Sequence, residues 1–105
     1  MMIHKTINEN DVTLAISGRL DSVTQSELAQ ELETVFKTKV YTLILDLSGL
    51  EYLSSAGLRV FLSARRMASE TGGKVKIIGA SDAINEILQI TGYADITVMA
   101  KRGRS

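Results

Sequence analysis

The sequence contains no cysteine, and its only histidine is His4. Without cysteine the chain can form neither a disulfide nor a thiolate nucleophile. One histidine and no cysteine also leave too few of the side chains that bind zinc or copper, so a metal site made by protein side chains alone is not expected. We therefore expect no metal and no other cofactor.

Long apolar runs are missing as well. No stretch approaches the roughly 20 apolar residues that a membrane-spanning helix needs, so we expect no insertion into a membrane. Residues 1–5 lack the basic head, the apolar middle and the cleavage site of a secretory signal. The expected location is the cytoplasm.

Neither sign of charge is in excess, because twelve Lys and Arg residues balance twelve Asp and Glu residues. Proteins that bind nucleic acid through its phosphates usually carry a basic excess, so nucleic acid is not an expected partner. The one basic cluster lies at the C-terminal end, and we expect residues 100–105 to form a flexible tail. The chain of 105 residues has room for one domain, whose core we expect over about residues 3–99.

The hydrophobic pattern predicts an α/β fold that opens with a β-hairpin. Apolar and polar residues alternate along residues 12–17, and the turn-rich residues 8–11 join this strand to an earlier one at residues 2–7. Residues 41–47 are almost all apolar, which is typical of a central strand covered on both faces. Further strands are expected at residues 75–79 and near residues 96–99.

Three helices are expected between these strands. The second covers about residues 55–71, and the third begins near residue 81 and stops near Gly92. The first begins near Ser22, where the sequence offers two capping boxes, Ser22/Gln25 and Thr24/Glu27. The order β-β-α-β-α-β-α-β implies a mixed β-sheet with helices packed against it.

The second predicted helix carries one polar stripe on an otherwise apolar surface. Its members are spaced four, three and four residues apart, and they are Arg59, Ser63, Arg66 and Glu70. This spacing places them on one side of a helix, which must face solvent or a partner.

The segment most informative about function joins the central strand to this helix. A loop over residues 48–53 is expected to deliver Ser54, Ser55, Ala56 and Gly57 to the start of the helix. Unpaired backbone N–H groups and the positive end of the helix dipole meet there, so a phosphate on Ser55 would be favoured. The simpler interpretation is that Ser54 or Ser55 is only the N-cap of the helix. Physical chemistry alone leaves both interpretations open.

Catalysis is not expected at this segment. Residues 55–57 match the second half of a nucleophile-elbow motif, but Leu53 stands where the motif requires a glycine. His4 lies in the opening hairpin, and no motif brings it to a serine as a base. Asp21 and Asp46 are better explained as turn or cap residues than as an acid/base pair.

Three motifs allow a comparison with known families: Ser17-Gly18-Arg19-Leu20-Asp21, Leu45-Asp46-Leu47-Ser48-Gly49-Leu50 and Tyr52-Leu53-Ser54-Ser55-Ala56-Gly57-Leu58. Together with the order of elements, they resemble the STAS domains of bacterial anti-sigma factor antagonists over nearly the whole chain. In the phosphorylated members of that family the motif reads Asp-Ser-Ser/Thr-Gly-Leu-Gly, and its first serine is the phosphoacceptor. Matched through Gly57 and Leu58, that serine is Ser55, with Ser54 as the less favoured acceptor.

The resemblance implies a partner-switching protein that is not itself an enzyme. The unphosphorylated protein would bind an anti-sigma factor with ATP-dependent serine kinase activity and so free the sigma factor. Phosphorylation of Ser55 would end the binding, and a serine phosphatase would restore it. The residues expected to contact the partner are Asp21, Ser22, Ser54, Ser55, Ala56, Gly57, Leu58, Arg59, Ser63 and Arg66.

Two residues depart from the family motif. Ser54 stands at the position of its aspartate and Arg59 at the position of its second glycine, so the local charge is less acidic. Two alternatives therefore stay open. One is a phosphorylation-independent STAS interaction module in another signalling or transport assembly. The other is a sensor of nucleotides or lipids, whose anion the helix start could hold.

Overall fold

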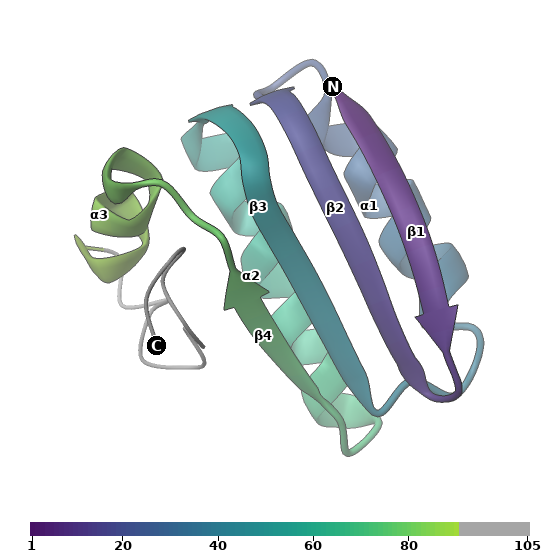
Figure 1. Cartoon of the computed structure of the whole chain (residues 1–105). Helices are drawn as coiled ribbons and strands as arrows, with labels where there is room; N and C mark the ends of the chain where they lie inside the picture. Colours follow the sequence, from purple (N-terminus) through teal and green to yellow (C-terminus); the bar gives the residue numbers. More distant parts are fainter. Residues whose placement is uncertain (91–105) are drawn as a thin grey trace.

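Figure 1 shows the computed structural model of the chain, which describes residues 1–90. Its elements are β1 (Met2–Asn8), β2 (Asp11–Leu20), α1 (Gln25–Val35), β3 (Thr42–Leu53), α2 (Ser55–Glu70), β4 (Lys74–Ile78) and α3 (Asp82–Ile90). Over the described residues this order agrees with the prediction. The predicted helix stop at Gly92, the predicted strand near residues 96–99 and the predicted tail lie outside them.

The strands form one mixed sheet in the order β1-β2-β3-β4. β1 and β2 are antiparallel, whereas β3 runs parallel to both β2 and β4. Figure 1 shows α1 behind β1 and β2, α2 behind β3 and β4, and α3 beside the end of β4. The predicted α/β fold with a mixed sheet, an opening hairpin and helices packed against the sheet is confirmed.

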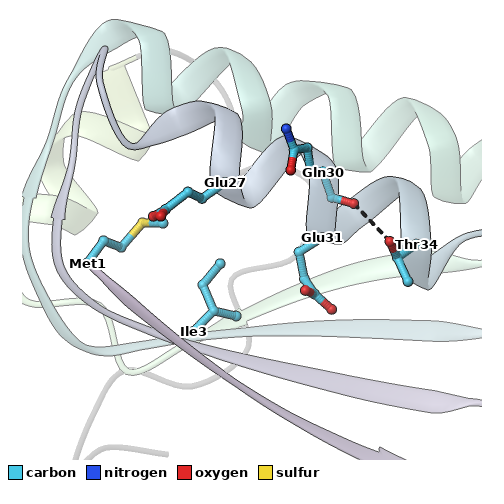
Figure 2. A pocket seen from close by; sticks show the side chains of 6 residues that line it. All are labelled: Met1, Ile3, Glu27, Gln30, Glu31 and Thr34. Carbon is cyan, nitrogen blue, oxygen red and sulfur yellow. Dashed lines mark hydrogen bonds between the residues drawn. The ribbon is translucent and has the colours of Figure 1, made fainter.

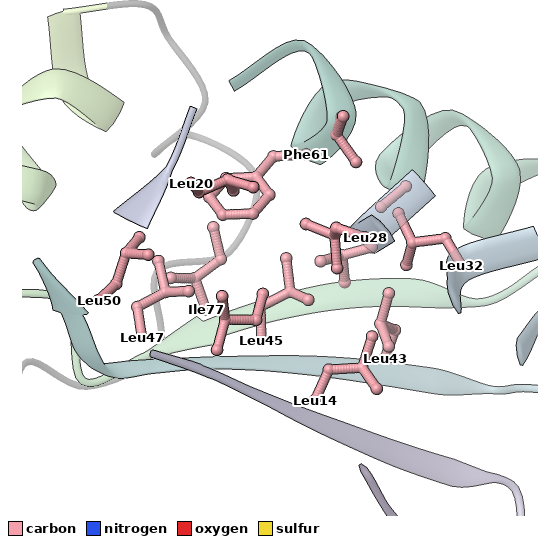
Figure 3. Close-up of a cluster of buried hydrophobic side chains, with 14 of the residues drawn as sticks. Leu14, Leu20, Leu28, Leu32, Leu43, Leu45, Leu47, Leu50, Phe61 and Ile77 are labelled. Carbon is pink, nitrogen blue, oxygen red and sulfur yellow. The ribbon is translucent and has the colours of Figure 1, made fainter. Parts of the chain in front are cut away.

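The hydrophobic core lies between the sheet and the layer formed by α1 and α2 (Figure 3). Burying a leucine, isoleucine or phenylalanine side chain stabilises the fold by about 1.5–3 kcal/mol relative to leaving it exposed. Fully buried side chains come from α1, α2 and α3 and from three strands, and they include Leu14, Leu28, Leu32, Leu43, Leu45, Leu47, Phe61, Ile77 and Leu88.

β3 is longer than the sequence predicts. The apolar run ends at residue 47, but the strand continues to Leu53 because its parallel pairing with β2 continues as far as the Leu20–Leu53 pair. The register shifts between Ala15 and Ser17, where the pairing is irregular. Such an irregularity breaks the alternation of buried and exposed residues. The end of the strand therefore cannot be predicted from the hydrophobic pattern. The predicted loop over residues 48–53 is therefore wrong.

β3 is also not buried on both faces, as its apolar run predicts. Leu43, Leu45 and Leu47 are buried against the helices, whereas Ile44 and Asp46 between them are only half-buried. The reason is that α1 and α2 lie on the same side of the sheet.

The sequence predicts that the first helix begins near Ser22, but α1 begins three residues later, at Gln25. The carboxylate of Asp21 accepts hydrogen bonds from the backbone N–H groups of Val23 and Thr24, both at 3.0 Å. These bonds hold residues 21–24 in a turn ahead of the helix. Thr24 is the N-cap residue, but its side chain caps no helix N–H group. The early start at Ser22 and both predicted capping boxes, Ser22/Gln25 and Thr24/Glu27, are therefore wrong.

The other two helices agree with the prediction. α2 covers Ser55–Glu70 and is followed by Gly72, whose φ of 80° suits glycine after a helix end. The hydroxyl of Ser81 accepts a hydrogen bond from the backbone N–H of Ile84 at 3.2 Å and so caps α3. None of the helices within residues 1–90 is long and apolar enough to cross a membrane.

Candidate functional site

The start of α2 is attached directly to the sheet. β3 ends at Leu53 and α2 begins at Ser55, so Ser54 is the only residue between them. The backbone N–H of Ser54 donates a hydrogen bond to the carbonyl oxygen of Leu20 at 2.9 Å. The end of β2 therefore fixes the position at which the helix begins.

The two adjacent serines are used differently. Ser54 is the N-cap of α2, because its Oγ accepts a hydrogen bond from the backbone N–H of Gly57 at 3.2 Å. Ser55 is the first helical residue and is exposed, and its hydroxyl makes no hydrogen bond to the part of the chain that the structure describes. The N-cap interpretation of the sequence therefore holds for Ser54 and leaves Ser55 without a structural role.

Gly57 allows α2 to approach the end of β2 closely. A Cβ atom at this position would lie 2.6 Å from Cγ of Leu20 and 3.0 Å from its carbonyl oxygen. Leu58 is buried as well, and Ala56 is half-buried. Among the predicted contact residues, Gly57 and Leu58 therefore lie beneath the surface on which Ser55 is exposed.

The loop after β2 lies beside this helix start, because Leu20 contacts both Ser54 and Gly57 and is followed at once by Asp21. The hydrogen bond from the backbone N–H of Thr24 is the main cause that holds the pKa of the Asp21 carboxyl below its ordinary value of 3.8. Arg19, whose Nε lies 3.7 Å from the Asp21 carboxylate, acts in the same direction. Asp21 therefore presents a negative charge next to the helix start.

Arg19 and Tyr52, which no local sequence pattern marks as site residues, also belong to this end of the sheet. They are paired across β2 and β3, and the guanidinium carbon of Arg19 lies 4.1 Å from the centre of the Tyr52 ring. Tyr52 remains 41% exposed. Stacked Arg and Tyr side chains are common in protein interfaces. Their pairing is visible only once β3 is known to continue to Leu53.

The remaining predicted contact residues follow α2 away from Ser55. Arg59 and Arg66 are exposed, and Ser63 is half-buried. Ser63 and Arg66 line a cavity of about 270 Å³ between α1 and α2. At 1.5 Å per residue, Arg66 lies roughly 16 Å from Ser55 along the helix. The structure thus groups Asp21, Ser22, Ser54, Ser55 and Arg59 at the helix start, with Ser63 and Arg66 further along.

A separate cavity of about 380 Å³ lies between β1 and α1 (Figure 2). It is lined by Met1, Ile3, Glu27, Gln30, Glu31 and Thr34, and includes none of the predicted site residues. The Glu31 carboxylate forms an ion pair with Lys5 at 2.9 Å. Over residues 1–90, no group of three or more His, Asp or Glu side chains is placed to hold a metal ion.

The residues considered for catalysis lie in structural positions. His4 is exposed on β1, where it pairs with Ala15, as expected of a surface strand residue. The carboxylate of Asp46 accepts hydrogen bonds from the backbone N–H of Ser48 at 3.0 Å and from its hydroxyl at 2.6 Å. Asp46 therefore stabilises the irregular part of β3.

Comparison with known proteins connects this geometry to one family. The family model described as "Mlab, STAS domain" matches residues 3–99. The anti-sigma-B factor antagonist of Bacillus subtilis is 30% identical over 89 residues, which cover 85% of this chain and 81% of that protein. The protein of the same name from Listeria monocytogenes is 28% identical over 99 residues, which cover 91% of this chain and 87% of that protein.

Two solved structures support the same assignment of the fold. The unphosphorylated form of the anti-sigma factor antagonist SpoIIAA matches with a TM-score of 0.85 at 16% identity, over 96% of this chain and 88% of that chain. The phosphorylated form of the Bacillus SpoIIAA protein matches with a TM-score of 0.78 at 16% identity, over 96% of this chain and 91% of that chain. At such identities the likeness concerns the fold alone.

Proposed function

This chain belongs to the STAS domain family that includes the bacterial anti-sigma factor antagonists, and from this membership we propose that it acts as an anti-sigma factor antagonist. In this role it binds an anti-sigma factor and thereby frees the sigma factor. The serine kinase activity of that anti-sigma factor transfers the terminal phosphate of ATP to Ser55, which ends the binding. A serine phosphatase removes the phosphate by hydrolysis. The chain itself acts by binding and not by catalysis.

The observation that carries the proposal is the different use of the two adjacent serines. The Ser54 hydroxyl is engaged as the N-cap of α2, whereas Ser55 is exposed at the first helical position. A kinase can therefore reach Ser55 without breaking the cap. This difference favours Ser55 over Ser54 as the phosphoacceptor.

The charges around Ser55 support a switch that leaves the fold intact. A phosphate adds about −1.5 to −2 charges, which the positive end of a helix dipole tolerates well. The same phosphate stands next to the loop that begins with the negatively charged Asp21. Phosphorylation thus adds bulk and negative charge to the surface on which the partner would dock.

Phosphate transfer tests the proposal directly. The purified protein is incubated with ATP and with each kinase-type anti-sigma factor of the source organism, and the phosphate is located by mass spectrometry. One phosphate is expected on Ser55 in the parent and in Ser54→Ala, and none in Ser55→Ala. Ser69→Ala is the matched control, because Ser69 is exposed near the other end of α2. Phosphate on Ser54, or on neither serine, contradicts the proposed switch.

Binding to the same anti-sigma factor is the second test. Calorimetry is expected to give tight binding for the parent and Ser55→Ala, and at least tenfold weaker binding for the phosphorylated protein and Ser55→Asp. Equal affinity of all four proteins would contradict regulation at Ser55.

A phosphorylation-independent interaction module in another signalling or transport assembly is the second candidate. Arg59 favours it, because this exposed residue stands where the phosphorylated family members carry glycine. Affinity purification with the parent and with Ser55→Asp separates the two candidates. A transport component that both proteins recover equally supports the module, whereas a kinase recovered only by the parent supports the switch.

A further inference from the structure

Arg59 lies one helical turn after Ser55, and both residues are exposed on α2. Residues four apart are neighbours on a helix, with about 5–6 Å between their Cβ atoms. Side chains on a helix lean toward its N-terminus, so a residue covers the turn that precedes it. The side chain of Arg59 is therefore within reach of a group attached to Ser55.

The charge of Arg59 is not compensated in the unmodified protein. The ion pairs Lys5–Glu31 and Arg19–Asp21 do not include Arg59, and its side chain has no acidic partner among residues 1–90. The first turn of α2 contains no acidic residue. A cation near the positive end of a helix is also disfavoured by the helix dipole. A positive charge that is kept at such an unfavourable position is expected to have a role in function.

We propose that Arg59 binds the phosphate of phosphorylated Ser55 and serves as its counter-ion within the same helix. The inference rests on the proposed phosphorylation of Ser55. A guanidinium group is well suited to the contact, because its N–H groups form strong charge-assisted hydrogen bonds with phosphate oxygens. The backbone N–H groups of Ser55 and Ala56 have no partner within the helix and can add to it, whereas that of Gly57 is already bound to Ser54.

This contact changes what phosphorylation does to the surface of α2. The phosphate draws Arg59 back toward the helix start and neutralises part of its charge. Modification of one serine thus removes two exposed groups from the surface offered to a partner, the Ser55 hydroxyl and the Arg59 guanidinium. The phosphorylated helix start is also more stable than the unmodified one.

The test uses the full chain with phosphoserine incorporated at position 55 during synthesis, so that it needs no kinase. The titration of the phosphate is followed by ³¹P NMR in the parent, Arg59→Gln and Arg66→Gln. Arg59 is expected to hold the pKa of the phosphate below its ordinary value of about 6. Removing this charge in Arg59→Gln should raise the pKa of the phosphate, which means that its acid dissociation constant falls about twofold. An exposed ion pair between residues four apart gives an effect of this size.

Arg66→Gln is the matched control for general charge, because it makes the same substitution on the same helix at roughly 16 Å from Ser55. This distance exceeds the screening length of about 10 Å in 0.1 M salt, so no shift is expected. In about 1 M salt, where the screening length falls to roughly 3 Å, the difference between the parent and Arg59→Gln should largely disappear. Circular dichroism of each variant confirms that the fold is retained.

Three results would overturn the contact: an unchanged dissociation constant in Arg59→Gln, an equal change in Arg66→Gln, or a difference that persists at high salt. A kinase that never modifies Ser55 would instead remove the proposed regulation and leave this titration unaffected. The two failures can therefore be told apart.

Discussion

The hydroxyl oxygen of Ser54 lies 3.2 Å from the backbone nitrogen of Gly57 and caps α2. Ser54→Ala removes this hydrogen bond and is expected to lower the free energy of unfolding by about 1 kcal/mol. That loss corresponds to a decrease in Tm of roughly 4–8 °C for a domain of this size. Urea unfolding measures it. Ser55→Ala should change stability by less than about 0.5 kcal/mol, and equal losses in both variants would contradict the separate roles of the two serines.

Gly57→Ala is expected to destabilise the protein although alanine favours helices. The new methyl group would lie 2.6 Å from Cγ of Leu20, and overpacking of this kind costs about 1–3 kcal/mol. This loss outweighs the gain of up to about 1 kcal/mol from helix propensity. Thermal unfolding is the measurement. In a Leu20→Ala background the cost should shrink, and a constant cost in both backgrounds would show that the Leu20 side chain is not its source.

Asp21 makes stability depend on pH in the acid range. Its pKa in the folded protein lies below the ordinary value of 3.8, so the unfolded chain takes up a proton at higher pH than the folded chain does. Its stabilising contribution is therefore complete above the ordinary pKa and is lost as the pH falls through the lower folded pKa. Asp21→Asn should be less stable than the parent at pH 7, and the difference should shrink between pH 4 and pH 2.

Thermal unfolding at several pH values tests this dependence. Asp11→Asn is the control, because Asp11 is exposed and makes no side-chain hydrogen bond within residues 1–90. A stability difference between the parent and Asp21→Asn that stays constant down to pH 2 would rule out the role assigned to the Asp21 carboxylate.

Arg19 and Tyr52 should be energetically coupled. Their separation of 4.1 Å is within the range of cation–π contacts, which contribute about 0.5–1 kcal/mol at exposed sites. A double-mutant cycle with Arg19→Gln and Tyr52→Leu measures the coupling in urea unfolding. The pair Lys74 and Tyr41, separated by 5.7 Å, is the comparison and should show weaker coupling. Equal coupling in the two pairs would mean that the closer stacking of Arg19 adds nothing.

The sequence predicts the type and order of the elements well wherever burial imposes a regular pattern. Val12, Leu14 and Ile16 alternate with less buried residues because one face of β2 packs on the helices. The end of β3 could not be predicted in the same way. After Leu47 its buried residues are Leu50 and Leu53, at every third position, so the period of two that identifies a strand is lost.

The sequence also locates the candidate site but does not distinguish its two serines. Both Ser54 and Ser55 suit an N-cap, and the choice depends on where β3 ends. The hydrogen bond from Ser54 to Leu20 fixes the end of β3 and so makes Ser54 the N-cap. This bond follows from strand pairing over a long separation in the sequence. For the same reason, local patterns could not predict the pairing of Arg19 with Tyr52.

The direct passage from β3 to α2 constrains how any change at Ser55 can be communicated. One residue separates sheet from helix, and that residue is bonded to the sheet on one side and caps the helix on the other. No hinge is available at this junction to convert a local event into a distant rearrangement. A partner that distinguishes two chemical states of Ser55 must therefore contact the start of α2 itself, at Ser55 or at Arg59 one turn later.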